Sequence, residues 1–275
     1  MRRRSLGLLA ATTLTAPFAA RAAWPDRPVT VIVPYPPGGN NDILARLLAP
    51  VVEREIGQPL VIDNRGGGGG TIGAGQAARA TPDGHTVLFA DIGILAIAPH
   101  LFTSLPFGPD SFAPVIRLTE VSLLLGVPRE SPHRSVADLI AAARARPEAL
   151  NFGTPGPGTA GHLATQMLLS LTGTRMTHVP FRGSAPAAQE LVAGRIDLLI
   201  DGTLLPAVQQ GSIRALAVTG GTRSPFTPEL PTVGEAGVPG YAFASWHGVV
   251  APRGAPAEAI ARLNAAFNAA LRDAT

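Results

Sequence analysis

The stretch PVTVIVPYPPGGNNDILARLLAPVVEREIG, at positions 28–57, decides the fold class. Its first seven residues are almost wholly apolar and mostly β-branched, which predicts a strand buried on both faces. The turn Pro36–Gly39 follows, and the run Ile43–Ile56 then has apolar residues at helical spacing up to Gly57, a typical helix stop. Pro50 could kink this helix. A buried strand that leads through a Gly/Pro turn into an amphipathic helix indicates a parallel α/β sheet.

Strand-like and helix-like runs alternate along the rest of the chain in two halves. Strands are predicted at 59–63, 85–90, 150–152, 176–180, 195–200 and 213–218, and helices at 72–80, 135–145, 160–171 and 186–193. Two long apolar-rich stretches, Val115–Val127 and Ala242–Val250, could cross between the halves, and the helix Ala257–Leu271 is expected to complete the first. We therefore predict two α/β domains, residues 24–123 plus 241–275 and residues 124–240.

The N-terminus predicts export. Three arginines at 2–4, a short apolar run at 6–20 and the small-residue sequence Ala20-Arg21-Ala22 together form a secretory signal peptide, cleaved near Ala22. The run is too short to span a bilayer, which needs about 20 apolar residues. A retained membrane anchor is the alternative, and the paired arginines leave ordinary and twin-arginine export equally open. We expect a periplasmic protein.

Export changes the charge of the chain. The 22 basic residues are all arginine, and removal of residues 1–22 leaves 18 of them against 19 acids. The mature chain therefore has no basic excess, and we expect no nucleic-acid partner. The chain has no cysteine, which excludes disulfides, thiolate metal sites and a cysteine nucleophile.

Two loops share one design, in which a strand runs into glycine-rich sequence that opens a helix. The first is 36–42 (PPGGNND) and the second 153–159 (GTPGPGT). The start of a helix presents free backbone N–H groups and about half a positive charge, so it attracts anions without Lys or Arg. Ordinary strand-to-helix turns are the alternative, in which Asn40, Asn41 and Thr159 cap the helices. The predicted ligand-binding residues of these loops are Tyr35, Pro37, Gly38, Gly39, Asn40, Asn41, Asp42, Gly153, Thr154, Gly156, Gly158 and Thr159.

Four further residues are candidates for ligand contact: Asp91, His162, Ser184 and Asp201. Asp91 and Asp201 follow strands, at the sheet edge where ligands of parallel α/β proteins bind. An aspartate in an anion site would select a donor group on the ligand, such as an amine or a hydroxyl. His162 is the only histidine near a proposed loop, and Ser184 lies in the loop 181–184 before the helix predicted at 186–193, where its hydroxyl could donate to a ligand. Asp42, in a first helical turn, is also a favourable partner of the helix dipole.

The glycine run is the main rival motif. Residues 68–73 (GGGTIG) fit G-x-G-x-x-G, and Asp91 follows at about the offset of the dinucleotide fingerprint. Five consecutive glycines match many such patterns by chance, and export removes the chain from cytoplasmic NAD. We therefore interpret the run as a turn and expect no cofactor.

Catalytic and metal-binding motifs find no support in the sequence. No serine lies in a G-x-S-x-G elbow, and no histidine pair has i, i+4 spacing for a metal. We expect a binding protein and not an enzyme.

At the two loops the sequence resembles the receptors of tripartite tricarboxylate transporters, called the Bug family. The matching pieces begin with WPDRPVTVIVPYPPGGNNDILAR at 24–46, DNRGGGGGTIGA at 63–74 and ATPDGHTVL at 80–88. They continue with NFGTPGPGTAGHLA at 151–164, HVPFRGSAPAAQELVAGRIDLLID at 178–201, GSIRALAVTGGTRSP at 211–225 and LPTVGEAGVPGY at 230–241.

The resemblance implies a two-domain, type II periplasmic-binding-protein-like fold that closes over a small carboxylate, or a related acid or amide. It also implies delivery to membrane permease subunits, and we expect a monomer. In the family the two loops grip one carboxylate, largely through backbone groups, and the matching positions here are 37–42 and 153–159. A sensory receptor of a two-component system would use the same binding chemistry and is an alternative.

This chain departs from the family pattern in three places. Asn40 stands where a Ser or Thr is common, and Asp91 stands where small polar residues are usual. Both departures could alter which ligand is accepted. Relatives are expected to continue beyond Thr275 with a further strand and helix that finish the first domain.

Overall fold

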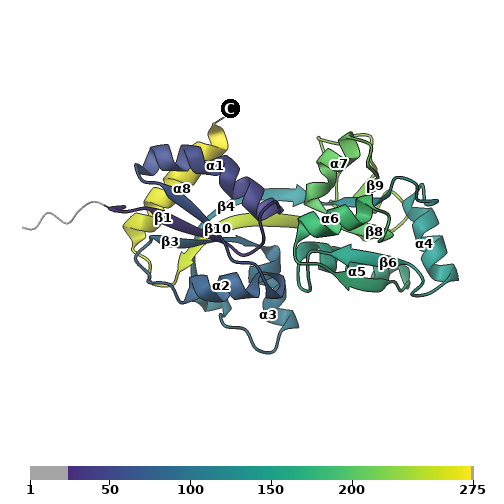
Figure 1. Cartoon of the computed structure of the whole chain (residues 1–275), viewed down its shortest axis with the longest axis horizontal. Helices are drawn as coiled ribbons and strands as arrows, with labels where there is room; N and C mark the ends of the chain where they lie inside the picture. Colours follow the sequence, from purple (N-terminus) through teal and green to yellow (C-terminus); the bar gives the residue numbers. More distant parts are fainter. Residues whose placement is uncertain (1–23, 274–275) are drawn as a thin grey trace, which may run out of the picture.

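The computed structural model describes residues 24–273, which form two lobes, each built on a five-stranded sheet (Figure 1). The predicted signal peptide at 1–22 lies outside the described residues. Within 24–273, no helix is both long and apolar enough to cross a membrane.

The first lobe contains a mixed sheet with strand order β2-β1-β3-β10-β4. Strands β1, β2 and β3 run parallel, and β10 runs antiparallel to both β3 and β4. Their bounds are Val29–Val33 (β1), Leu60–Asn64 (β2), Thr86–Asp91 (β3), Phe112–Ser122 (β4) and Ala244–Pro252 (β10). The predicted α/β organisation of this half is confirmed.

Helices cover both faces of this first sheet. Helices α1 (Asn40–Ile56) and α8 (Ala257–Arg272) share one apolar cluster, and α2 (Thr71–Ala78) packs in another on the opposite face. Val31 belongs to the first cluster and its neighbour Ile32 to the second, because successive strand residues point to opposite faces. This double burial explains the continuous apolar run of β1. The helices that remain are α3 (Ala98–Leu101), the π-helix at Gly93–Ile97 and 3-10 turns at Gly68–Gly70 and Pro109–Ser111.

The second lobe repeats the design, with strand order β7-β6-β8-β5-β9. Its strands are Leu124–Pro128 (β5), Asn151–Thr154 (β6), Thr177–Pro180 (β7), Leu198–Asp201 (β8) and Ile213–Val218 (β9). Helices α4 (Val136–Ala145) and α5 (Ala160–Thr172) contribute to one apolar cluster, whereas α6 (Ser184–Val192) and α7 (Leu205–Gln209) contribute to a second. A 3-10 turn at Gly202–Leu204 precedes α7.

Two neighbouring strands connect the lobes (Figure 1). Strand β4 continues through Leu123 into β5, and the chain returns from the second lobe into β10, where Ala244 pairs with Ser122. Thr219 holds both crossings, because its hydroxyl accepts the N–H of Leu123 at 2.8 Å and its carbonyl accepts that of Phe243 at 2.7 Å. We propose that the two domains meet between residues 123 and 124 and between residues 240 and 241, as predicted.

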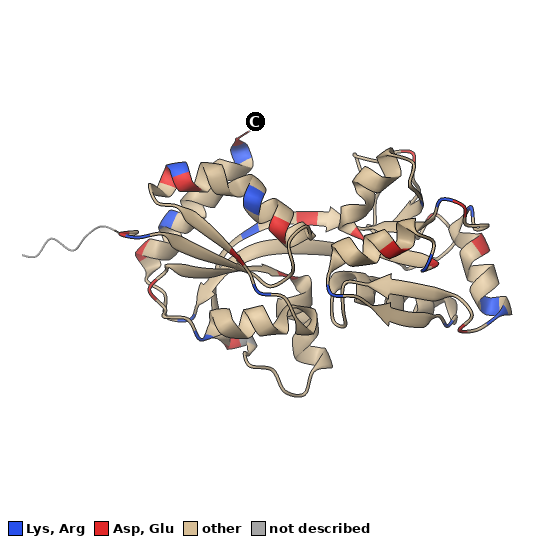
Figure 2. Cartoon of the chain, viewed as in Figure 1, with Lys and Arg blue, Asp and Glu red and all other residues tan. Residues whose placement is uncertain are grey.

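The described charges are mixed in sign over both lobes (Figure 2). Arginines and acidic residues both occur in each lobe.

Candidate functional site

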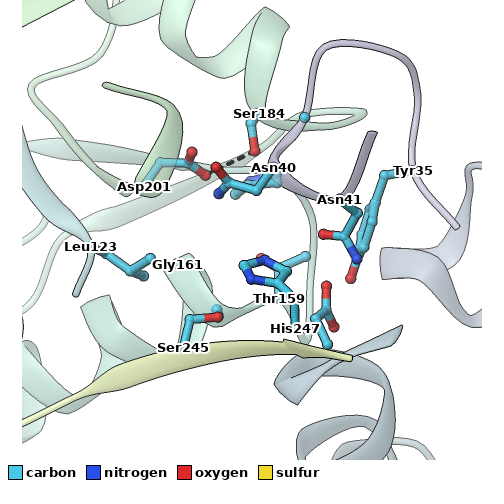
Figure 3. Close-up of a pocket in the computed structure, with 14 residues that line it drawn as sticks. Tyr35, Asn40, Asn41, Leu123, Thr159, Gly161, Ser184, Asp201, Ser245 and His247 are labelled. Atoms are coloured by element: carbon cyan, nitrogen blue, oxygen red, sulfur yellow. Dashed lines mark hydrogen bonds between the residues drawn. The ribbon is translucent and has the colours of Figure 1, made fainter. Parts of the chain in front are cut away.

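A hollow lined by residues of both lobes lies between them, and we call it the central cavity (Figure 3). It has about 460 Å³ of empty space, including the part open to solvent. Eight predicted residues line it: Tyr35, Gly39, Asn40, Asn41, Asp91, Thr159, Ser184 and Asp201.

Three helices begin at the central cavity. Helix α1 follows Gly39, α5 follows Thr159 and α6 follows Gly183, and none of these three starts is capped by a side chain. Within the described chain, no group accepts the backbone N–H of Asn40 or Asn41 in α1, or of Ala160 or Gly161 in α5. Each start adds about half a positive charge. The cavity therefore offers backbone donors from both lobes, and no arginine is among its lining residues.

The alternative in which Asn40, Asn41 and Thr159 cap the helices is wrong, because no side chain caps α1 or α5. The amide nitrogen of Asn41 donates instead to the Phe89 carbonyl at 3.3 Å, and the Thr159 hydroxyl donates to the Gly156 carbonyl at 2.7 Å. Asn40 packs against the second lobe, since a Cβ atom at Gly202 would lie 2.7 Å from its amide nitrogen. Because these side chains do not cap the helices, the first backbone amides remain available.

Asp201 lies at the end of β8 and faces the central cavity (Figure 3). One carboxylate oxygen accepts the Ser184 hydroxyl at 2.9 Å, and the other accepts the N–H of Thr203 at 2.8 Å and its hydroxyl at 2.7 Å. Burial raises the pKa of Asp201 above its ordinary value, and these three hydrogen bonds offset only part of that effect. The Asp201 carboxylate therefore makes most of its hydrogen bonds to Ser184 and Thr203 of its own lobe.

Asp91 lies at the end of β3 in the first lobe. Its Oδ1 accepts the N–H of Ile94 at 3.1 Å. The side chain is 7% exposed and neighbours Tyr35. Burial, with a further contribution from Asp91, raises the pKa of the Tyr35 phenol well above its ordinary value, so this side chain stays neutral. Asp91 and Asp201 thus place two carboxylates in the lining of one cavity.

His247 is a lining residue that the sequence did not predict. It lies on β10 opposite Asp91, and its Nδ1 is 2.9 Å from the Thr119 hydroxyl. Burial lowers the pKa of His247, and the nearby Asp91 and Asp201 only partly offset this, so the ring is neutral near pH 7. The sequence suggested His162 as the only histidine near the site, which is wrong. The lining residues not predicted are Leu123, Pro155, Ala160, Gly161, Ser245 and His247.

Pro37, Gly38 and Asp42 were predicted in the first loop, but the structure places them outside the central cavity lining. Asp42 turns back into the first lobe, where it accepts the Gly38 N–H at 2.9 Å and binds Arg46 at 2.9 Å. The amide of Asn64 donates to the same carboxylate at 3.0 Å. Asp42 is therefore a partner of the start of α1, as predicted. Because it accepts the Gly38 N–H, that N–H is not available to a ligand.

Five predicted residues of the second loop also lie outside this lining: Gly153, Thr154, Gly156, Gly158 and His162. They hold the loop together instead. The Thr154 hydroxyl is 2.7 Å from Nε2 of His178 and accepts the Gly156 N–H, while the Gly158 N–H donates to Nδ1 of His162 at 3.3 Å. The rings of His162 and His178 stack with centroids 4.6 Å apart.

A second hollow shares Tyr35 and Pro155 with the central cavity. It is lined by the glycine run at 66–70, by Gly156 and by residues 180–183, which include the exposed Arg182. The glycine run includes a 3-10 turn at Gly68–Gly70, has positive φ at 67–70 and approaches the second lobe at Pro157. Among the described residues, no group of three His, Asp or Glu side chains is arranged to hold a metal ion.

Solved structures of similar proteins have the same two-lobed fold. The R. palustris protein Rpa4515, solved with adipate, is 43% identical, with 89% of this chain and 83% of that chain covered and a TM-score of 0.86. MatC (Rpa3494) from Rhodopseudomonas palustris, solved with bound malate, is 37% identical, with 91% and 86% covered and a TM-score of 0.88. The predicted periplasmic-binding-protein-like fold is confirmed.

The sequence comparisons agree with these structures. Protein BugT of Bordetella pertussis is 34% identical over 271 residues, which are 97% of this chain and 83% of BugT. The sequence model of the family described as "Tripartite tricarboxylate transporter family receptor" matches residues 44–275. The chain therefore belongs to the family of tripartite tricarboxylate transporter receptors.

Proposed function

We propose that this chain is a periplasmic receptor that captures a small carboxylate between its lobes and delivers it to the membrane components of a tripartite transporter. The single observation that carries this proposal is the pair of helix starts, α1 from the first lobe and α5 from the second, with free amides at one cavity. Solved relatives with adipate and with malate support a carboxylate as the ligand class.

In this proposal the ligand stabilises a closed form of the receptor. A carboxylate that accepts hydrogen bonds from Asn40 and Asn41 in one lobe and from Ala160 and Gly161 in the other binds the closed form more tightly than the open one. Differential affinity of this kind shifts the open–closed population. The chain then acts as a binding protein and not as an enzyme, and we propose that it works as a monomer.

The backbone donors can be tested by proline substitution at the first position of a helix. Ala160→Pro removes the N–H of the first residue of α5 and replaces it with a methylene group. Thr159 has φ −76° and ψ 163°, an extended conformation that tolerates a following proline. The matched control is Ala257→Pro, an exposed first residue of α8 that follows Pro256 at φ −58° and ψ 137°.

Calorimetric titration with a panel of mono-, di- and tricarboxylates and amides provides the measurement. We expect at least one small acid to bind the unaltered chain, Ala160→Pro to weaken its binding about tenfold or more, and Ala257→Pro to leave it unchanged. Loss of one charge-assisted hydrogen bond, at about 1.5–3 kcal/mol, corresponds to that factor. A folded chain that binds no acid and no amide would contradict the proposal.

A further inference from the structure

Asn41 presents to the central cavity an acceptor that no part of the described chain uses. The amide nitrogen of Asn41 donates to the Phe89 carbonyl at 3.3 Å, and a backbone carbonyl only accepts, so the orientation of the side-chain amide is fixed. Its Oδ1 therefore points away from Phe89, and no donor of the described chain contacts it. Asn41 is 4% exposed and lines the cavity. Figure 3 shows it extending into the space between Tyr35 and His247.

Asp91 adds further acceptor capacity on the same side. Its Oδ1 accepts one backbone hydrogen bond, from the N–H of Ile94 at 3.1 Å. A carboxylate has about four acceptor positions, so others face its neighbours Tyr35 and His247. The hydroxyl of Tyr35 also donates to the Gly69 carbonyl, at 3.3 Å. We call Asn41, Asp91 and His247 the acceptor side of the cavity.

The charge of the lining disfavours a ligand with two carboxylates. Asp91 lies on the acceptor side with free carboxylate capacity, His247 is neutral, and no arginine lines the cavity. Burial raises the pKa of Asp201 and so opposes its ionisation. Three helix starts contribute about half a positive charge each, and in the proposed function the first carboxylate of the ligand lies at these starts. A dianion would bring two more negative charges into this small space. A ligand whose second polar group donates hydrogen bonds meets no such repulsion.

We propose that the acceptor side binds an N–H donor group, a primary ammonium or a carboxamide, so that the ligand is a small acid with one carboxylate and one such group. The carboxylate would lie at the helix starts, as in the proposed function on which this inference rests. The donor group would bind the Asn41 carbonyl and the Asp91 carboxylate, with the neutral His247 ring as a third neighbour. Asp91 is then the residue that selects against dicarboxylates.

Matched ligands test this inference on the unaltered full chain. At each length from four to six carbons, calorimetry compares the dicarboxylate, its monoamide and the corresponding ω-amino acid, for example adipate, adipamate and 6-aminohexanoate. We expect the monoamide or the amino acid to bind at least about tenfold tighter than the dicarboxylate of the same length. Whichever of the two binds tighter identifies the donor as amide or ammonium.

Two different results would overturn the inference, and only the second would also overturn the proposed function. A dicarboxylate that binds as tightly as its amide and amino partners removes the donor preference but leaves carboxylate capture intact. A folded chain that binds no member of the series and no other small acid removes the proposed function as well.

Substitution of Asp91 tests whether this residue causes the preference for a ligand with an N–H donor group. Asp91→Asn keeps an oxygen for the Ile94 N–H, removes the charge and replaces the other oxygen by an amide NH2 donor, so we expect dicarboxylate affinity to rise and the donor preference to fall about tenfold. The control is Glu130→Gln, which removes a charge from a side chain that is 91% exposed on the second lobe. An unchanged ligand ratio in Asp91→Asn would overturn the assignment to Asp91.

Discussion

Gly69 lies so close to Pro157 that a Cβ atom at Gly69 would be 2.1 Å from the Pro157 carbonyl oxygen. Gly69 belongs to the turn before α2 in the first lobe, and Pro157 to the loop before α5 in the second. The glycine run that resembled a nucleotide motif is thus the place where the lobes approach backbone to backbone. Glycine is required there because any side chain would hold the lobes apart.

Gly69→Ala should favour the open form and weaken ligand binding about tenfold or more. The control is Gly57→Ala, because Gly57 also has a positive φ, 74° against 64°, but a Cβ atom there would meet nothing within 4 Å. Both variants should lose about 1–2 kcal/mol of stability for the left-handed backbone, and only Gly69→Ala should lose affinity. Chemical denaturation and calorimetry measure the two effects. Equal affinities in the two variants would show that the contact does not limit closure.

Asp42→Asn should destabilise the chain by about 1–3 kcal/mol without changing ligand affinity. Asp42 is buried and accepts from Gly38, Arg46 and Asn64, and an asparagine would turn an amino group toward one of these donors. Urea denaturation and calorimetry provide the two readouts, with Asp110→Asn, a 96% exposed side chain, as the control. A large loss of affinity in Asp42→Asn would return this residue to the ligand site.

The stacked histidines should make stability depend on pH. Burial lowers the pKa of His162, and burial together with His162 lowers that of His178, so the unfolded chain binds protons more readily than the folded one. Stability should therefore fall as pH drops below about 6.5, the ordinary histidine pKa. A protonated His162 also cannot accept the Gly158 N–H, so the second loop should loosen in the same range.

Denaturation midpoints at pH 7.5 and 5.5 test this dependence. His162→Asn should reduce the difference between the two midpoints, whereas His100→Asn, at an exposed site, should leave it unchanged. An unaltered difference in His162→Asn would assign the effect to other groups.

Arg182 is an exposed cation in the second hollow, where it pairs with no carboxylate of the described chain. We expect Arg182→Gln to slow the association of an anionic ligand about two- to tenfold at low salt, because a charge at the rim steers the approach of the ligand. Stopped-flow measurements should show the difference vanishing at high salt, with little change in dissociation. Arg134→Gln, exposed on the second lobe, is the control, and an equal effect in both variants would exclude local steering.

Much of the fold could be predicted because local patterns determine it. The run at 28–57 has a doubly buried strand, a Gly/Pro turn and an amphipathic helix that ends at Gly57 with φ 74°. The stretches Val115–Val127 and Ala242–Val250 were predicted to cross between the halves, and they contain most of β4, β5 and β10. In each case the period of apolar residues is a local property of the chain.

The site was predictable only in part, because its contacts are made over long distances in sequence. The two loops were found, but the sequence does not tell that Asp42 uses the Gly38 N–H or that His162 uses the Gly158 N–H. His247 was missed because it lies within an apolar strand and reaches the cavity only through its pairing with Asp91. The contact between Gly69 and Pro157 likewise depends on how the two lobes pack.

A crystal structure of the mature chain with its tightest-binding small acid tests the central claim most directly. We expect one carboxylate in the central cavity, with oxygens within about 3.2 Å of backbone amides from both helix starts, Asn40–Asn41 and Ala160–Gly161. A carboxylate bound elsewhere on the molecule, or held by amides of one lobe only, would contradict it.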